Sequence, residues 1–192
     1  MVIVFTDRRQ ASLPLAEVIA GAVDGGARLV VLREKDMPSP ERAALAARLH
    51  AVLAPVGGQL LLAGPVAGPD GQHLAVADPW PATPRGLIGR SCRDAGELAK
   101  AGAEGAGYAT ISPVCTSRSK PGYGPPVGMV RLTQLCADAA VPVYALGGVD
   151  DPDRAAACRT AGASGFAVMG AVMRSADPAA LVASLITAWG TG

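Results

Sequence analysis

The chain has 192 residues, of which 50% are hydrophobic and only 4% are aromatic. This length supports one sizeable core rather than two, so we expect a single domain over residues 1–192, with a core of Ala, Val and Leu. Seventeen basic side chains nearly balance sixteen acidic ones, and no run of like charges forms a stripe that would bind a polyanion, so nucleic acid is excluded as a partner.

Eight short runs rich in leucine and β-branched residues predict strands. They are residues 2–6, 29–32, 60–62, 72–75, 87–91, 108–112, 143–146 and 166–169. Ala- and Leu-rich segments with helical spacing lie between most of them, at residues 41–53, 94–101, 130–139, 154–161 and 179–189. Eight alternating units favour a closed parallel (β/α)8 barrel, a TIM barrel of the α/β class, over an open sheet of five or six strands.

The segments between the strands carry repeated boundary signals. Capping residues before prolines predict three helix starts, at Ser39, Asp151 and Asp177. Glycines in left-handed turns predict three helix exits, at Gly26, Gly102 and Gly162. Because a typical barrel has about 250 residues, this chain must be compact. Residues 62–72 are rich in Gly and Pro, so we expect the third helix to be lost or reduced to a turn.

In barrels of this kind the loops after the strands form the active site. The second expected strand is followed by Arg33, Glu34, Lys35 and Asp36, and the sixth by a loop at residues 113–124 that combines hydroxyls, two cations and glycines. A phosphate needs backbone N–H groups that approach closely, with a cation or hydroxyl to complete its shell. We expect the backbone N–H groups to come from the ends of the last two strands, at Gly147, Gly148, Met169 and Gly170. We expect the loop after the sixth strand to supply the hydroxyls and the cation, from Ser117, Ser119 and Lys120.

Six stretches resemble, in the same order, the motifs of the thiamine phosphate synthases and of their relatives, the thiazole tautomerases. They are VVLREK, GPDGQHLAVAD, IGRS, PVCTSRSK, YALGGV and GASGFAVMGAV, and they span nearly the whole chain. Synthases of this family join a pyrimidine pyrophosphate to a thiazole phosphate, and a magnesium ion assists the departure of pyrophosphate. The resemblance therefore implies a small phosphorylated thiazole or pyrimidine-type ligand, Mg²⁺ as a possible cofactor, and a homodimer.

The resemblance also implies roles for individual residues. Arg33 and Lys35 match the cations that bind pyrophosphate, and Asp78 matches one metal-ligand aspartate. Ser91 matches the serine after the fifth strand and is a candidate ligand-binding or phosphate-binding residue. The family's phosphate-binding loops match the residues already proposed for the cradle, Ser117, Ser119, Lys120, Gly147 and Gly148. The candidate catalytic residues are then Arg33, Lys35, Arg93 and Lys120.

Some positions depart from the family pattern. Val31 stands where the family has an amide, and Ala63 and Gly64 stand where it has Asn-Asp, so a pyrimidine anchor and a metal ligand are missing. Asp78 without a partner carboxylate holds Mg²⁺ weakly unless pyrophosphate supplies most of the shell. In the tautomerases a histidine after the fifth strand moves the proton, and Arg93 fills that place here. Because arginine stays protonated, it binds anions but is a poor base.

Three interpretations follow from the sequence. The chain is an enzyme of thiamine thiazole metabolism (a synthase or a tautomerase-like isomerase), a non-catalytic barrel that binds a phosphorylated ligand, or an enzyme for another phosphorylated metabolite. Cys92, Cys115 and His73 are candidates for proton transfer, although packing is the commoner role for such residues.

The compartment is also predicted from the sequence. No apolar stretch is long enough to cross a bilayer, and no basic leader precedes the first strand. The cysteines stand singly without a C-x-x-C pair, as is usual in a reducing compartment. We expect a cytoplasmic protein that has neither a membrane partner nor a zinc site.

Overall fold

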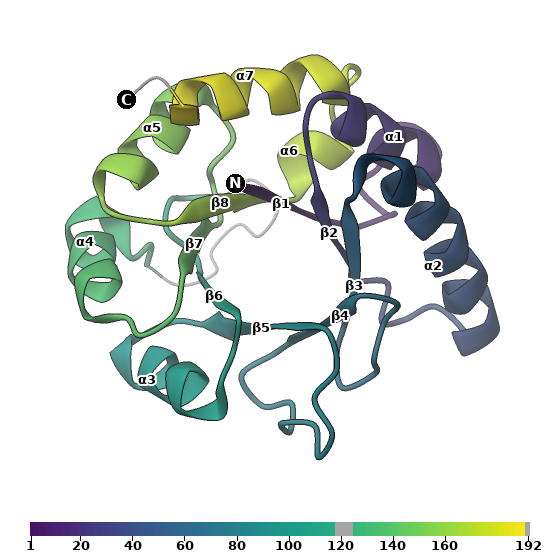
Figure 1. Ribbon diagram of the computed structural model, residues 1–192. Helices are drawn as coiled ribbons and strands as arrows, with labels where there is room; N and C mark the ends of the chain where they lie inside the picture. Colours follow the sequence, from purple (N-terminus) through teal and green to yellow (C-terminus); the bar gives the residue numbers. More distant parts are fainter. Residues whose placement is uncertain (118–124, 191–192) are drawn as a thin grey trace.

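The computed structural model describes residues 1–117 and 125–190 and shows a closed barrel of eight parallel strands (Figure 1). The strands are β1 (Val2–Phe5), β2 (Leu29–Leu32), β3 (Gln59–Ala63), β4 (Gly71–Leu74), β5 (Leu87–Cys92), β6 (Tyr108–Ile111), β7 (Val143–Leu146) and β8 (Gly165–Val168). Each strand pairs with its neighbours in sequence, and β1 pairs with β8 to close the ring. The predicted α/β barrel is confirmed, and every predicted strand overlaps an observed one.

Helices surround most of this barrel. They are α1 (Leu15–Asp24), α2 (Ser39–Leu53) with the 3₁₀ turn η1 (Ala54–Val56), α3 (Ala95–Glu104), α4 (Gly128–Asp138), α5 (Pro152–Thr160), α6 (Gly170–Met173) and α7 (Pro178–Gly190). Only loops follow β3 and β4, and Figure 1 shows the resulting gap in the ring of helices between α2 and α3. The predicted loss of the third helix is confirmed. The fourth helix is missing as well, because Pro79, Pro81 and Pro84 interrupt the segment at residues 75–86.

Arg90 on β5 holds the loop that replaces the fourth helix. Its side chain is only 3% exposed and forms an ion pair with Glu104 at the end of α3. The guanidinium also donates to the carbonyls of Ala75 and Asp78, at 2.8 and 2.7 Å, and lies 5.8 Å from the centre of the Trp80 ring. A buried cation thus ties residues 75–80 to the barrel wall where a helix would otherwise pack.

Most predicted helix boundaries agree with the structure, and one capping role and one helix exit differ. Asp151 and Asp177 cap α5 and α7 by accepting from backbone N–H groups at 2.8 and 2.9 Å. Helix α2 does start at Ser39, but the predicted capping role of this residue is wrong: Pro38 precedes the helix, Ser39 is its first residue, and no side chain caps the start.

The helix exit predicted at Gly102 is also wrong. Gly102 lies inside α3, and Gly105 adopts the left-handed conformation instead, with φ +83°. The extra turn is held in place because Glu104 binds the buried Arg90. The other two exits, at Gly26 and Gly162, do have positive φ.

Two layers of buried side chains fill the molecule. The outer layer packs strands against helices, whereas the inner layer fills the barrel and includes Tyr108 and Tyr144. Glycines on the neighbouring strands make room for these rings: a Cβ at Gly89 would lie 2.1 Å from Cζ of Tyr108, and one at Gly165 would lie 2.4 Å from Cε1 of Tyr144. Within the described residues, no helix has the length and apolar character needed to span a membrane.

Candidate functional site

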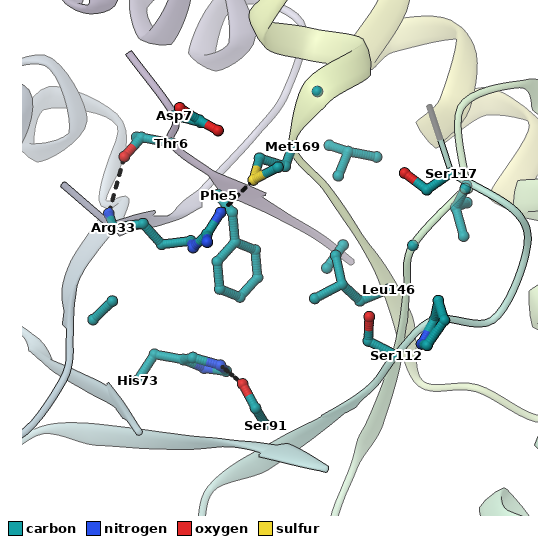
Figure 2. Close-up of a pocket in the computed structure, with 18 of the residues that line it drawn as sticks. Phe5, Thr6, Asp7, Arg33, His73, Ser91, Ser112, Ser117, Leu146 and Met169 are labelled. Atoms are coloured by element: carbon teal, nitrogen blue, oxygen red, sulfur yellow. Dashed lines mark hydrogen bonds between the residues drawn. The ribbon is translucent and has the colours of Figure 1, made fainter. Parts of the chain in front are cut away.

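A cavity of about 830 Å³ lies at the carboxyl ends of the strands. This volume falls within the range of roughly 300–1,000 Å³ that small-molecule sites usually have. Phe5, Leu146 and Met169 contribute apolar surface, and polar groups from the loops surround them (Figure 2). The cavity lies where the sequence predicted a ligand site, at the end of the barrel to which the strands point.

Two of the predicted site residues, Arg33 and Lys35, line the cavity. The backbone N–H of Arg33 donates to Oγ1 of Thr6 at 3.0 Å, and its guanidinium extends across the cavity toward the sulfur of Met169 (Figure 2). The ammonium of Lys35 lies 3.6 Å from Oδ2 of Asp78. Two positive charges therefore stand on the side of the cavity formed by β1 and β2.

Glu34, between these two cations, holds the loops after β1 and β2 together. It is 4% exposed and accepts from the Thr6 hydroxyl at 2.9 Å, the Arg8 N–H at 3.1 Å and the Arg8 guanidinium at 2.8 Å. Arg8 also binds both carboxylate oxygens of Asp36, at 2.9 and 2.7 Å. Hydrogen bonds from Arg8 and Arg9 hold the pKa of Asp36 well below its usual range. The acidic groups of the second loop are thereby neutralised, and Arg33 and Lys35 remain directed at the cavity.

His73 and Ser91 form the β4 and β5 side of the cavity. Nδ1 of His73 lies 2.9 Å from the Tyr108 hydroxyl, and Nε2 lies 2.8 Å from Oγ of Ser91. Burial, with the charges of Lys35 and Arg33, lowers the pKa of His73 to about 3. The imidazole is therefore neutral at physiological pH.

Arg93 lines the cavity next to Ser91, but its side chain is well exposed and lies 3.8 Å from the Glu97 carboxylate. Asp78, the predicted metal ligand, accepts from the Ala75 N–H at 2.8 Å and pairs with Lys35. The described residues contain no group of three or more His, Cys, Asp or Glu side chains that would hold a metal ion. The side chains present therefore do not fit a Mg²⁺ site built by the protein.

The remaining side of the cavity comes from the loops after β6, β7 and β8. It includes five of the predicted site residues, Ser117, Gly147, Gly148, Met169 and Gly170. Gly147 and Gly148 have φ of +95° and +71°, and a Cβ at Gly148 would lie 2.3 Å from the Thr116 carbonyl oxygen. The two glycines thus allow the loops after β6 and β7 to pack closely. Ser119 and Lys120 lie outside the described residues.

Two cysteines, Cys92 and Cys115, also line the cavity. Burial raises the pKa of the Cys92 thiol to about 12, and burial raises the pKa of Cys115 as well. Both are therefore protonated thiols at neutral pH, which agrees with a packing role rather than proton transfer.

The loop after β1 was not predicted to belong to the site. Phe5, Thr6 and Asp7 line the cavity, and Thr6 connects Glu34 to Arg33. The signal was present in the sequence, because a hydroxyl and a carboxylate directly follow a buried strand there. The charged cluster after the second strand was recognised by the same kind of signal, polar residues that directly follow a buried strand.

Comparisons with known proteins match this chain over most of its length. The sequence profile of a family described as thiamine monophosphate synthase matches residues 2–172. A putative thiamine-phosphate synthase of Geobacter sulfurreducens is 39% identical over 186 residues, which cover 90% of this chain and 86% of that protein. A thiamine-phosphate synthase of Anaeromyxobacter dehalogenans is 37% identical over 191 residues, which cover 93% of this chain and 84% of that protein. Thiamine phosphate pyrophosphorylase from Pyrococcus furiosus superposes with a TM-score of 0.85 at 25% identity, covering 98% of this chain and 95% of that one.

Proposed function

Because the chain belongs to the thiamine monophosphate synthase family of thiamine biosynthesis, we propose that its cavity binds phosphorylated thiazole and pyrimidine ligands and that it forms thiamine phosphate. One observation carries the proposal: Arg33 and Lys35 face the same cavity as the glycine loop at Gly147 and Gly148. A ligand with a pyrophosphate and a partner with a phosphate both find complementary groups there.

The two sides of the cavity suit the two anionic groups. The cations after β2 would stabilise the charge that develops on pyrophosphate as its bond to the pyrimidine carbon breaks. The thiazole phosphate would lie on the side of the glycine loop, where Ser117 adds a hydroxyl. Between these sides, Phe5 and Leu146 offer apolar surface for flat rings (Figure 2). In this proposal, the positive side chains of the chain, rather than a metal held by its carboxylates, stabilise the leaving group.

The proposal is tested by incubating the protein with both precursors and Mg²⁺ and measuring thiamine phosphate. Removal of one group that stabilises transition-state charge typically costs about 100-fold in rate, so Arg33→Ala is expected to lower kcat/KM by roughly that factor. Lys100→Ala is the matched control, because Lys100 lies on α3 and does not line the cavity. Absence of product with the unaltered protein would contradict synthase activity.

A second candidate is a barrel that binds a phosphorylated ligand without transferring it. Ala63 and Gly64 at the end of β3 offer no polar side chain to a pyrimidine, and Asp78 is already engaged by Lys35. Tight binding of thiazole phosphate without turnover would establish this function.

The tautomerase-like alternative has less support, because no side chain predicted for proton transfer is an effective base. Arg93 cannot take up a proton, Cys92 and Cys115 have raised pKa values, and His73, with a pKa of about 3, is a weak base. Conversion of a thiazole phosphate carboxylate by the purified chain would nevertheless establish an isomerase.

A further inference from the structure

A hydrogen-bonded chain of three side chains runs from the barrel interior to the cavity, and the function proposed above assigns it no role. Tyr108 on β6 and His73 on β4 are buried, whereas Ser91 on β5 is partly exposed and lines the cavity. The imidazole of His73 lies between the two hydroxyl groups. Its Nδ1 is 2.9 Å from the Tyr108 hydroxyl, and its Nε2 is 2.8 Å from the Ser91 hydroxyl. Figure 2 shows the last contact at the edge of the cavity.

Aromatic packing fixes the orientation of the imidazole. The Phe5 ring meets it edge-on, with centroids 4.9 Å apart, and the Tyr108 ring stacks on it at 5.6 Å with an interplanar angle of 29°. Tyr108 is itself confined against Gly89, where a Cβ would lie 2.1 Å from Cζ of the tyrosine. The ring of His73 therefore keeps Nδ1 directed at Tyr108 and Nε2 directed at Ser91.

A neutral imidazole carries its proton on one ring nitrogen only, and the hydrogen-bond partners of His73 decide whether this is Nδ1 or Nε2. The Tyr108 hydroxyl is buried, and among the described residues its hydrogen-bond partner is Nδ1 of His73 alone. A proton on Nδ1 would leave the hydroxyl proton of Tyr108 without an acceptor, and buried donors without partners are costly. Tyr108 therefore donates to Nδ1, and the proton of His73 lies on Nε2.

This assignment fixes the direction of the next hydrogen bond. Nε2–H donates to Oγ of Ser91, so the hydroxyl proton of Ser91 is not used by His73. Thr110, the register partner of Ser91 on β6, is not within hydrogen-bonding reach: its buried hydroxyl has no partner among the described residues. The proton of Ser91 is thus available to a ligand in the cavity.

We propose that Tyr108 and His73 hold the hydroxyl of Ser91, which the family resemblance already implies as a phosphate ligand, as a hydrogen-bond donor toward the cavity. His73 is then a positioning residue that acts through Ser91. Only the identity of the ligand rests on the proposed function. The proton position on His73 is a property of the protein without ligand.

The proton position is measured directly by ¹⁵N and ¹³C NMR of the imidazoles in the unliganded protein. The chain has two histidines, and His50→Gln identifies the signal of the other. The expected result is a neutral His73 protonated on Nε2 with Nδ1 as acceptor. A proton on Nδ1 would overturn the proposal, because Ser91 would then donate to His73 rather than to a ligand.

Ligand binding supplies the second test, with inorganic pyrophosphate as the probe and calorimetry as the measurement. Ser91→Ala is expected to weaken binding about tenfold, as loss of a hydrogen bond to a charged group does. Tyr108→Phe, which removes only the distal donor, is expected to weaken binding severalfold in the otherwise unaltered protein and not at all in the Ser91→Ala background.

Two results of this second test would overturn the proposal. Unchanged affinity in Ser91→Ala would show that Ser91 does not donate to the anion. An equal effect of Tyr108→Phe in both backgrounds would show that Tyr108 acts through packing and not through Ser91. A failure to form thiamine phosphate would leave both the NMR result and these affinities intact, so the two proposals fail separately.

Discussion

A buried neutral histidine links the stability of this protein to pH. The pKa of His73 is about 3 in the folded protein, against about 6.5 for an unperturbed histidine. Between these two values the unfolded chain binds a proton at this position and the folded chain does not. Stability contributed by the neutral imidazole is therefore complete above about pH 6.5 and is lost as the pH falls toward 3.

The low pKa of His73 predicts different acid sensitivity for two variants. Within that window the unaltered protein should lose about 1.4 kcal/mol of unfolding free energy per pH unit more than His73→Gln does. Urea denaturation between pH 7 and pH 4.5 measures both slopes. His50→Gln is the control that removes the other histidine, which is partly exposed on α2. Parallel slopes for all three proteins would contradict the argument.

At the scale of residues, the sequence predicted the chemistry of the rim better than the interior beneath it. Arg33, Lys35 and Gly147 were predicted because each follows a recognisable strand, and parallel strands bring their carboxyl ends together. The contacts of His73 with Tyr108 and Ser91 depend on which side chains of three strands face inward. A shift of one residue in strand register reverses that choice, and no local sequence signal fixes it.

At the scale of elements, the close packing of the loops after β6 and β7 at Gly148 can be tested by substitution. Gly148→Ala combines a positive φ with a contact of 2.3 Å to the Thr116 carbonyl oxygen, so the loop after β6 must move. Gly57→Ala is the matched control, since Gly57 has a φ of +65° and nothing within 4 Å. Both variants should lose about 1 kcal/mol from backbone strain. Only Gly148→Ala should also lose affinity for thiazole phosphate, measured by calorimetry, and equal affinities would exclude the glycine loop from the site.

The loop that replaces the fourth helix depends on the ion pair between Arg90 and Glu104. Removal of one partner of a buried pair typically costs about 3–5 kcal/mol, because the remaining charge loses its compensation. Arg90 keeps its bonds to two carbonyls, so Glu104→Ala is expected to cost about 2–3 kcal/mol in urea denaturation. Asp138→Ala, an exposed acidic residue at the end of α4, should cost less than about 0.5 kcal/mol. A similar small cost for both would show that the carbonyls alone hold Arg90.

The elements themselves were predictable to different degrees. Alternating apolar runs and helical segments specified the eight strands, and the Gly- and Pro-rich segment at residues 62–72 indicated one missing helix. The prolines at residues 79, 81 and 84 carried the same signal for the second missing helix. What replaces that helix was not predictable, since the buried pair of Arg90 and Glu104 joins residues of different elements.

For the molecule as a whole, the charge balance of the cavity is close to that of the chain, whose formal net charge is +1. Arg9, Arg33, Lys35, Arg93 and Arg174 line the cavity together with four acidic side chains, Asp7, Glu34, Asp36 and Asp150. Acidic groups at the same rim are engaged, as Glu34 is by Arg8. The carboxyl end of the barrel thus offers cations that can contact a small anion, without the excess of positive charge that would bind a polyanion.

The cations at this end of the barrel predict that small phosphorylated ligands stabilise the whole protein. A ligand at 100 times its dissociation constant adds about 2.7 kcal/mol, and 1 kcal/mol shifts Tm by about 2–4 °C in a chain of this size. Thiazole phosphate or pyrophosphate should therefore raise Tm by roughly 5–10 °C in a thermal-shift assay, and the shift should shrink in high salt. Arg33→Ala should reduce the shift and Lys100→Ala should not, because only Arg33 lines the cavity. If neither ligand shifts Tm at millimolar concentration, the cavity does not bind phosphorylated ligands of this kind, and the functional proposal fails at its first step.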